Sequence, residues 1–303
     1  MASAKTARRA TCEGFVRVEG GRVWYCIVGR PGATPLMTLH GGPGFPSDYL
    51  EPLEALADER QVVFYDQLGC GRSDRPSDKR LWRAPRFVKE LAQVRRALGL
   101  ERVHILGHSW GTQLATDYLL TRPRGVLSAI MASPAISIPR WIRDANRLRA
   151  RLPRRIRETL RVHEESDSTG CAEYAAATLA FYKRHVLRLD PWPEVFERTQ
   201  KAAGLEVYKT MWGPNEFTAA GNLRTFDRSA RLRELRLPML FTCGRYDEAT
   251  PETTARYSRA VRGSEMVVFP GCSHLVHLEN PTGYVRVVRN FLRRADRAAT
   301  SAS

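Results

Sequence analysis

The chain has 303 residues, of which 43% are apolar and 26% are charged. This length and composition suit one large α/β domain with an insertion, and they exclude wholesale disorder. No apolar run approaches 18 residues, so no membrane-spanning helix is expected. The 48 basic residues outnumber the 32 acidic ones, and the net charge of +16 favours nucleic acid, an anionic surface or an acidic protein as a partner.

The chain ends and the cysteines indicate a cytoplasmic protein. Residues 1–11 contain Lys5, Arg8 and Arg9 without a following apolar stretch, so they predict a loose tail and not a secretory signal. Residues 295–303 are also expected to form a loose tail. The six cysteines form neither a CxxC pair nor a zinc-binding spacing, which is typical of a reducing compartment.

In chain order, short apolar runs alternate with segments of helical spacing up to residue 135. Runs that end at Gly or Asp predict strands, and apolar residues at every third or fourth position predict helices. The predicted strands cover residues 23–28, 36–39, 62–65, 103–106 and 126–132, and the predicted helices cover residues 87–98 and 112–120. This alternation predicts a mostly parallel central sheet with helices on both faces.

The alternation stops near residue 136 and resumes near residue 237. The intervening segment is rich in Ala, Leu and Arg, has helical spacing and is divided by prolines. Beyond it we expect strands at residues 238–243 and 266–269, a helix from Pro251 with Thr250 as its N-cap, and a helix over residues 284–294. Residues 1–135 and 237–303 are therefore predicted to form an α/β core, and residues 136–236 an inserted helical cap (lid) domain.

A nucleophile is predicted at Ser109, in the GxSxG pattern formed by residues 107–111. The pattern follows a predicted strand and opens a predicted helix, which is the context that a nucleophile elbow needs. Its glycines permit a sharp turn that leaves Ser109 above the sheet, and the helix start favours developing negative charge. The alternative is an ordinary glycine-rich turn between a strand and a helix.

A serine hydroxyl needs a general base, and in this arrangement the acid and the histidine follow the serine in the chain. His274 lies in the loop after the strand at residues 266–269, and His277, three residues further on, is the alternative. Asp247 and Glu248 both follow the strand at residues 238–243. Asp247 is the predicted orienting acid, because its shorter side chain holds the imidazole more rigidly.

Two backbone N–H groups are expected to form an oxyanion hole. One belongs to Trp110, the residue after the nucleophile. The other is expected from the loop at residues 40–44, with the sequence HGGPG, where Pro43 has no N–H and Gly42 is the predicted donor. His40 in the same loop is expected to be structural.

Taken together, these motifs resemble the proline iminopeptidase (prolyl aminopeptidase) family of α/β-hydrolases. The matching segments are HGGPG at residues 40–44, YDQLGCGRS at 65–73, GHSWG at 107–111, GRYD at 244–247 and GCSH at 271–274. They span most of the chain in the family's order. The resemblance implies an α/β-hydrolase fold with an inserted helical cap and an aminopeptidase activity, with no metal or organic cofactor.

A further match, MWGPNEF at residues 211–217, resembles the cap of the tricorn-interacting-factor type of aminopeptidase. In that type two glutamates hold the free α-ammonium of the substrate, and the matching positions are Glu216 and Glu248. The alternatives are a solvated helix-edge glutamate at 216 and a charge near a helix N-terminus at 248. Leu68 stands where prolyl-specific members often have Arg, so a broader preference for proline or another small or apolar residue is expected.

The predicted reaction is release of an N-terminal aminoacyl group from a small peptide or aminoacyl amide through an acyl-enzyme. The alternative is an esterase or a carbon–carbon bond hydrolase of the same fold. An epoxide hydrolase or dehalogenase is disfavoured because those sites have Asp where Ser109 stands. A binding module is disfavoured by the complete triad, and no nucleic-acid motif or membrane segment is found. General peptide turnover and removal of an aminoacyl cap in secondary metabolism both stay open.

Much of the positive charge lies in one stretch of the predicted cap. Between Arg140 and Arg161 there are nine basic and two acidic residues, several of them at helical spacing. One interpretation is a solvated helix face. The other is a docking surface for an acidic partner, such as a carrier protein that bears the substrate.

Overall fold

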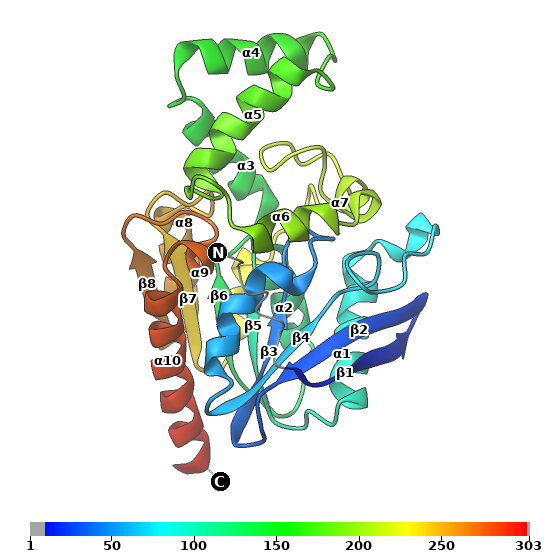
Figure 1. Ribbon diagram of the computed structural model, residues 1–303. Coiled ribbons are helices and arrows are strands. Elements are labelled where there is room, and N and C mark those ends of the chain that lie inside the picture. Colours follow the sequence, from blue (N-terminus) through cyan, green and yellow to red (C-terminus); the bar gives the residue numbers. More distant parts are fainter. Residues whose placement is uncertain (1–9, 302–303) are drawn as a thin grey trace, which may run out of the picture.

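The computed structural model describes residues 10–301. Its centre is an eight-stranded sheet with the order β1-β2-β4-β3-β5-β6-β7-β8 (Figure 1). Pairing is antiparallel between β1, β2 and β4 and parallel from β4 through β8, so the predicted mostly parallel sheet is confirmed. The strands are β1 (Ala10–Val18), β2 (Gly21–Val28), β3 (Ala33–Leu39), β4 (Arg60–Tyr65), β5 (Val103–His108), β6 (Val126–Ala132), β7 (Met239–Gly244) and β8 (Glu265–Phe269).

Neighbouring residues along each central strand point to opposite faces of the sheet, and each face has its own core. Ile105 packs in one core with helices α1 (Ala84–Ala97), α2 (Trp110–Leu120) and α8 (Pro251–Ala260). Leu106, one residue later, packs in the other with the 3₁₀ segment η1 (Ser47–Leu56) and helix α10 (Pro281–Ser301). Helices therefore cover both faces, as predicted. The remaining short elements are η2 (Lys79–Leu81), η3 (Ser229–Glu234) and α9 (Val276–Glu279).

The structure adds one strand that the sequence reasoning did not identify. Ala10 and Thr11, which were predicted to lie in a loose tail, belong to β1, which pairs with β2 through a tight turn at Gly20. Gly20 has φ of 97°, a conformation that other residues adopt only with strain. The rest of the predicted tail and its basic residues lies outside the described residues.

The prediction of a loose tail at residues 295–303 was wrong as far as Ser301, because α10 continues to that residue. An apolar stripe on α10 is buried against the sheet and extends beyond the predicted helix to Ala295. Ala-rich sequence favours continuation of the helix beyond that point. Residues 302–303 lie outside the described residues. Thr250 caps α8 as predicted, since the Thr253 N–H donates to its hydroxyl.

Five helices separate β6 from β7, all within the segment predicted to interrupt the core. They are α3 (Ile138–Arg149), α4 (Arg154–Glu165), α5 (Ala172–His185), α6 (Glu194–Lys201) and α7 (Leu205–Met211). In Figure 1 they gather above the carboxyl ends of the parallel strands, with α4 furthest from the sheet. Buried side chains of this segment join both cores: Trp141 on α3 and Trp212 after α7 lie in the core on the α1–α2 face, and Phe196 on α6 lies in the other core. None of the described helices is both long and apolar enough to cross a bilayer.

A buried polar cluster anchors α10 to the sheet. Arg60 on β4 has a side chain only 1% exposed, and its guanidinium lies 3.0 Å from Asp296 on α10. The other carboxylate oxygen of Asp296 lies 3.0 Å from His104 Nε2. Burial opposes ionisation of Asp296, but hydrogen bonds from His104 and Thr34 and the charge of Arg60 lower its pKa to about 2.

Substitution Asp296→Asn is expected to lower the free energy of unfolding at pH 7 by about 1–2 kcal/mol, because a charged hydrogen-bond acceptor is lost beside a buried cation. The folded-state pKa of Asp296 lies below its ordinary value of 3.8, so its contribution is complete above about pH 4 and disappears as the pH falls towards 2. Urea unfolding at pH 7 and pH 3 measures both effects. A stability difference that did not shrink at pH 3 would contradict the expected ionisation.

Candidate active site

The loops of the candidate site leave the carboxyl ends of neighbouring parallel strands. Residues 40–44 follow β3, Ser109 follows β5, Asp247 follows β7 and His274 follows β8. Carboxyl ends of parallel strands meet at one edge of a sheet, which is where ligand sites of open α/β folds form. The structure thus brings together residues that are up to 234 positions apart in the chain.

Ser109 lies in a sharp turn between β5 and α2, with φ of 53° and ψ of −120°. Left-handed backbone at a residue with a side chain is strained and must be held by its surroundings. A Cβ on Gly107 would lie 2.4 Å from the Gly111 carbonyl oxygen, and one on Gly111 would lie 2.1 Å from that of Leu39. Gly107 is therefore needed for the tight turn from β5 into α2, and Gly111 is needed for the close approach of α2 to β3.

Ser109 and His274 line the same cavity beneath the cap helices. Apolar side chains from the loop after α5 and from α6 complete its wall on the cap side, and Glu216 adds a carboxylate. The lining residues are Gly41, Gly42, Phe45, Tyr49, His108, Ser109, Val186, Phe196, Glu216, His274 and Leu275.

The imidazole of His274 is held between an acid and an aromatic ring. Its Nδ1 lies 2.8 Å from Asp247 Oδ1, and both side chains are buried. Asp247 also accepts from the backbone N–H of Ala249 at 2.7 Å, which fixes the orientation of the carboxylate. The indole of Trp141, from α3, packs edge-on to the imidazole with 5.6 Å between ring centroids. A carboxylate at Nδ1 favours the tautomer that leaves Nε2 free to accept a proton.

The two predicted oxyanion-hole amides are free within the described part of the chain. The N–H of Trp110 opens α2, where the first amides of a helix have no intrahelical partner. The N–H of Gly42 has no hydrogen-bond acceptor among residues 10–301, whereas that of Gly41 donates to the Tyr49 hydroxyl at 2.7 Å. Gly42 has φ of 106°, a backbone conformation that residues with a side chain adopt only with strain, so glycine is required at this position.

The two glutamates predicted to hold the amine both lie near His274, but only Glu216 lines the cavity. Glu216 Oε1 accepts from the Tyr208 hydroxyl at 2.8 Å. Glu248 is buried, and neither of its carboxylate oxygens has a hydrogen-bond partner within residues 10–301. Its Oε1 lies 4.0 Å from His274 Nε2, which is too far for a hydrogen bond. A buried carboxylate without a donor is costly, and it points to a missing cationic or donating ligand.

Burial and mutual repulsion make the two glutamates reluctant to ionise together. Burial raises the pKa of Glu216, against the opposing influence of His274 and of the Tyr208 hydrogen bond. Burial raises the pKa of Glu248 well above its ordinary value, and the charges of Glu216 and Asp247 raise it further. A cation placed between the two carboxylates would oppose both causes, because it favours the charged form of each.

His277, the alternative base, and His40, the predicted structural histidine, both occupy packing positions. His277 is fully buried against Tyr49, His108 and Tyr284, and burial lowers its pKa to about 3. His40 is buried too, and its Nε2 accepts from the Gln67 N–H at 2.8 Å. Neither ring lines the cavity that holds Ser109.

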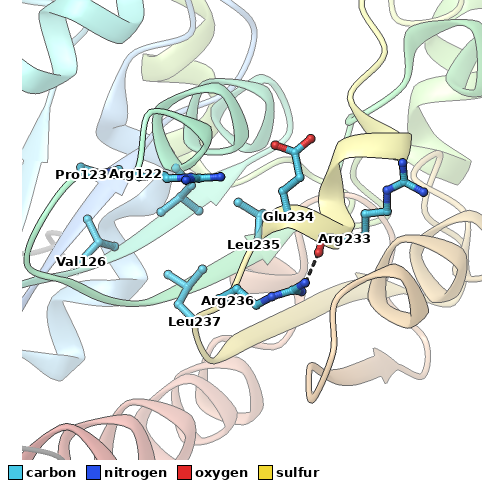
Figure 2. Close-up of a pocket in the computed structure, with 9 residues that line it drawn as sticks. Arg122, Pro123, Val126, Arg233, Glu234, Leu235, Arg236 and Leu237 are labelled. Carbon is cyan, nitrogen blue, oxygen red and sulfur yellow. Dashed lines mark hydrogen bonds between the residues drawn. The ribbon is translucent and has the colours of Figure 1, made fainter.

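A larger hollow of about 680 Å³ lies elsewhere, near the amino ends of β6 and β7. Figure 2 shows its wall, with Arg122, Arg233 and Arg236 around an apolar floor. No triad residue lines it, and it opens at the edge of the sheet opposite Ser109. Within residues 10–301 no group of three or more His, Cys, Asp and Glu side chains is arranged to hold a metal ion.

Comparisons with known proteins agree with this geometry. The α/β-hydrolase fold family matches residues 34–281. A proline iminopeptidase of Heyndrickxia coagulans is 49% identical over 284 residues, covering 92% of this chain and 98% of its own. The crystal structure of proline iminopeptidase from Mycobacterium smegmatis superposes with a TM-score of 0.89 at 37% identity, covering 95% of this chain and all of the other. The crystal structure of VinJ superposes with a TM-score of 0.91 at 35% identity, covering 94% and 99%.

The chain belongs to the proline iminopeptidase family of α/β-hydrolases. In this family member the segment YDQLGCGRS, at residues 65–73, lines no part of the cavity. Its Gln67 instead donates to the His40 carbonyl at 3.1 Å and accepts from the Trp110 indole at 2.9 Å. The segment therefore links the HGGPG loop to the turn that carries Ser109.

Sequence reasoning missed several side chains that support the site in this member of the proline iminopeptidase family. Tyr208 and Trp141 hold Glu216 through its carboxylate and its backbone carbonyl, respectively. Tyr49 contacts both the oxyanion loop and His108. The aromatic residues near MWGPNEF were visible in the sequence, but only the folded cap shows which of them face the glutamate.

Proposed function

We propose that Ser109, His274 and Asp247 act as the catalytic triad of a serine aminopeptidase. The Ser109 oxygen attacks the first carbonyl carbon of the substrate while its proton passes to His274 Nε2. His274 returns that proton to the leaving amine, and a water then releases the amino acid from the acyl-enzyme by the same route. The hydrogen bond of 2.8 Å between His274 and Asp247 supports this assignment.

The N–H groups of Gly42 and Trp110 are the proposed oxyanion hole. Trp110 follows Ser109 in the chain, and Gly42 lines the same cavity as Ser109. Neither N–H has an acceptor within the described residues. Donors that are already oriented towards the developing charge stabilise the tetrahedral intermediate without reorganisation. Residues 136–236 are proposed to serve as the cap that closes this site from water.

The family is one of aminopeptidases, and this protein is a serine hydrolase of that class. We assign Glu216 and Glu248 to the free α-ammonium of the substrate. The observation that carries this assignment is the buried carboxylate of Glu248, which has no donor among residues 10–301. A bound ammonium supplies both the charge and the hydrogen bonds that this carboxylate lacks. A blocked N-terminus supplies neither, so the pair selects for a free amine.

The acyl side of the cavity is apolar, which fits release of proline or another small or apolar residue. Phe45, Val186, Phe196 and Leu275 form this part of the lining. A simple esterase or carbon–carbon bond hydrolase is the alternative, but its substrate would leave the buried glutamates without a counter-charge. All six cysteines are free thiols, which supports a cytoplasmic setting.

Substitution Ser109→Ala is expected to abolish release of an arylamine from an aminoacyl arylamide. The nucleophile is lost while the cavity and the glutamates stay in place, so binding of the free amino acid should persist. Single-turnover kinetics and a competition binding assay measure the two effects. Turnover by Ser109→Ala at a rate close to that of the wild type would refute the proposed mechanism.

Substitution Glu216→Gln is expected to raise KM for aminoacyl arylamides, because one of two carboxylates facing the ammonium is lost. A loss of about tenfold to a hundredfold in kcat/KM corresponds to one charged hydrogen bond. Hydrolysis of an N-blocked ester of the same amino acid should change little. Equal losses on the free-amine and N-blocked substrates would show that Glu216 does not recognise the amine.

We propose, as a separate point, that the stretch between Arg140 and Arg161 docks an acidic carrier protein that presents the aminoacyl substrate. Several of its arginines are already neutralised, since Arg149 pairs with Glu164 and Arg161 pairs with Glu158 and Glu165. Other arginines in the stretch are exposed and form no ion pair within the described residues; these are Arg143, Arg151, Arg154, Arg155 and Arg157. Unpaired exposed cations are available to an anionic partner and steer its approach.

The double substitution Arg143→Glu and Arg151→Glu is expected to slow hydrolysis of an aminoacyl group attached to an acidic carrier protein. Hydrolysis of the matching small arylamide should be unaffected, because both positions lie outside the cavity. The matched control is Arg102→Glu, an exposed charge reversal before the opposite end of β5. Steady-state rates at low and moderate salt measure the effect. Equal rates on the carried substrate for all three proteins would exclude the docking surface.

A further inference from the structure

A buried chain of hydrogen bonds links the oxyanion loop to the loop of His274. The Gly41 N–H lies 2.7 Å from the Tyr49 hydroxyl, and that hydroxyl lies 2.9 Å from His108 Nδ1. On the other side of the ring, His108 Nε2 lies 3.0 Å from the His274 carbonyl oxygen. Tyr49 comes from η1, and His108 is the last residue of β5, directly before Ser109. This series of hydrogen bonds therefore passes directly behind Ser109.

The directions of these hydrogen bonds follow from the His274 end. A carbonyl can only accept, so His108 Nε2 carries the proton that is donated to His274. Burial keeps the His108 ring neutral, so its Nδ1 has no proton and is an acceptor. The Tyr49 hydroxyl therefore donates to Nδ1 and accepts from the Gly41 N–H.

The surroundings keep both side chains in these states. Burial, with His274 and His277 beside it, lowers the pKa of His108 well below its ordinary value. Burial raises the pKa of the Tyr49 hydroxyl, so the hydroxyl keeps its proton as a donor. The other titratable ring packed against this cluster, Tyr284, touches His277.

The His274 backbone is fixed by more than one donor. Its carbonyl accepts from the Ser133 hydroxyl at 2.9 Å as well as from His108. Its N–H donates to the His185 carbonyl at 3.2 Å. With the main chain held on both sides and Nδ1 bound to Asp247, the position of Nε2 over the cavity is determined by these contacts.

We propose that Tyr49 and His108 are positioning residues that hold the Gly41–Gly42 amides and the His274 loop in one fixed relation to Ser109. This inference rests on the proposed function. Neither residue donates or accepts a proton during the reaction. Their role is to keep the oxyanion donors and the base aligned at the same time, and a small misplacement of either reduces the rate of acylation.

The first test is Tyr49→Phe, which removes the hydroxyl and keeps the ring. It is expected to lower kcat for an aminoacyl arylamide by about tenfold to a hundredfold with little change in KM, because only alignment is lost. The affinity for an aminoboronic acid, which forms a tetrahedral adduct on Ser109, should fall by a similar factor. The affinity for the free amino acid should not change.

The matched control is Tyr118→Phe. The Tyr118 hydroxyl is also buried and bonded, accepting from Arg95 at 3.1 Å, but it lies at the far end of α2 from Ser109. A comparable loss of thermal stability with unchanged kcat is expected. If Tyr49→Phe lowers kcat no more than Tyr118→Phe, or weakens the amino acid and the boronic acid equally, the positioning role is refuted.

Substitutions of His108 separate the two halves of the chain and serve if Tyr49→Phe does not fold. His108→Asn keeps an acceptor near the Nδ1 position, and His108→Gln keeps a donor near the Nε2 position, whereas His108→Leu keeps neither. Each amide variant is expected to be more active than His108→Leu and less active than the wild type. Equal kcat for all three variants would show that only the volume of the ring matters. Activity in Ser109→Ala would instead refute the proposed function itself.

Discussion

The active site depends on the close approach of α2 to β3 at the nucleophile turn. Gly111 permits this approach, since a methyl group there would overlap the Leu39 carbonyl, and Gly107 permits the tight turn from β5, since a methyl group there would overlap the Gly111 carbonyl. The turn leaves Ser109 in a left-handed conformation above the sheet and leaves the Trp110 N–H without a partner in its helix. Hydrogen bonds on both sides hold the strained turn in place. The Trp110 indole donates to Gln67, and His108, the residue before the serine, donates to the His274 carbonyl.

The proposed selectivity of the site rests on the burial of charge. Asp247 is satisfied by His274 and by a backbone N–H, so its charge is compensated in the free protein. Glu248, the next residue, is equally buried but has no donor among the described residues. Of these two adjacent carboxylates, only Glu248 still lacks a hydrogen-bond donor within the described residues. In the proposed function the first orients the base, and the second receives the cation of the substrate, which would connect the cost of burial to recognition of a free amine.

Much of the fold could be predicted because local patterns and strand order agree. The β5 to α2 turn, the Thr250 cap and the mostly parallel sheet follow from short apolar runs and turn residues. β1 was missed because its short alternating pattern gains its stability from pairing with β2. The last helix was predicted too short because Asp296, a polar residue, is anchored by Arg60 and His104 from distant strands. Such long-range pairs leave no periodic signal in the sequence.

By itself, the sequence determined the α/β-hydrolase class, the family and the residues proposed for the triad, since glycine turns and motif order are local properties of the chain. Only the tertiary structure decided how Tyr49 and His108 connect two loops, and that within residues 10–301 Glu248 lacks a hydrogen-bond partner whereas Glu216 has one. Hydrogen bonding and burial depend on which segments meet in space. A sequence does not show whether a glutamate lies in water or beside a buried imidazole. The pKa of its carboxyl group depends on that environment, because the local dielectric and the neighbouring charges differ.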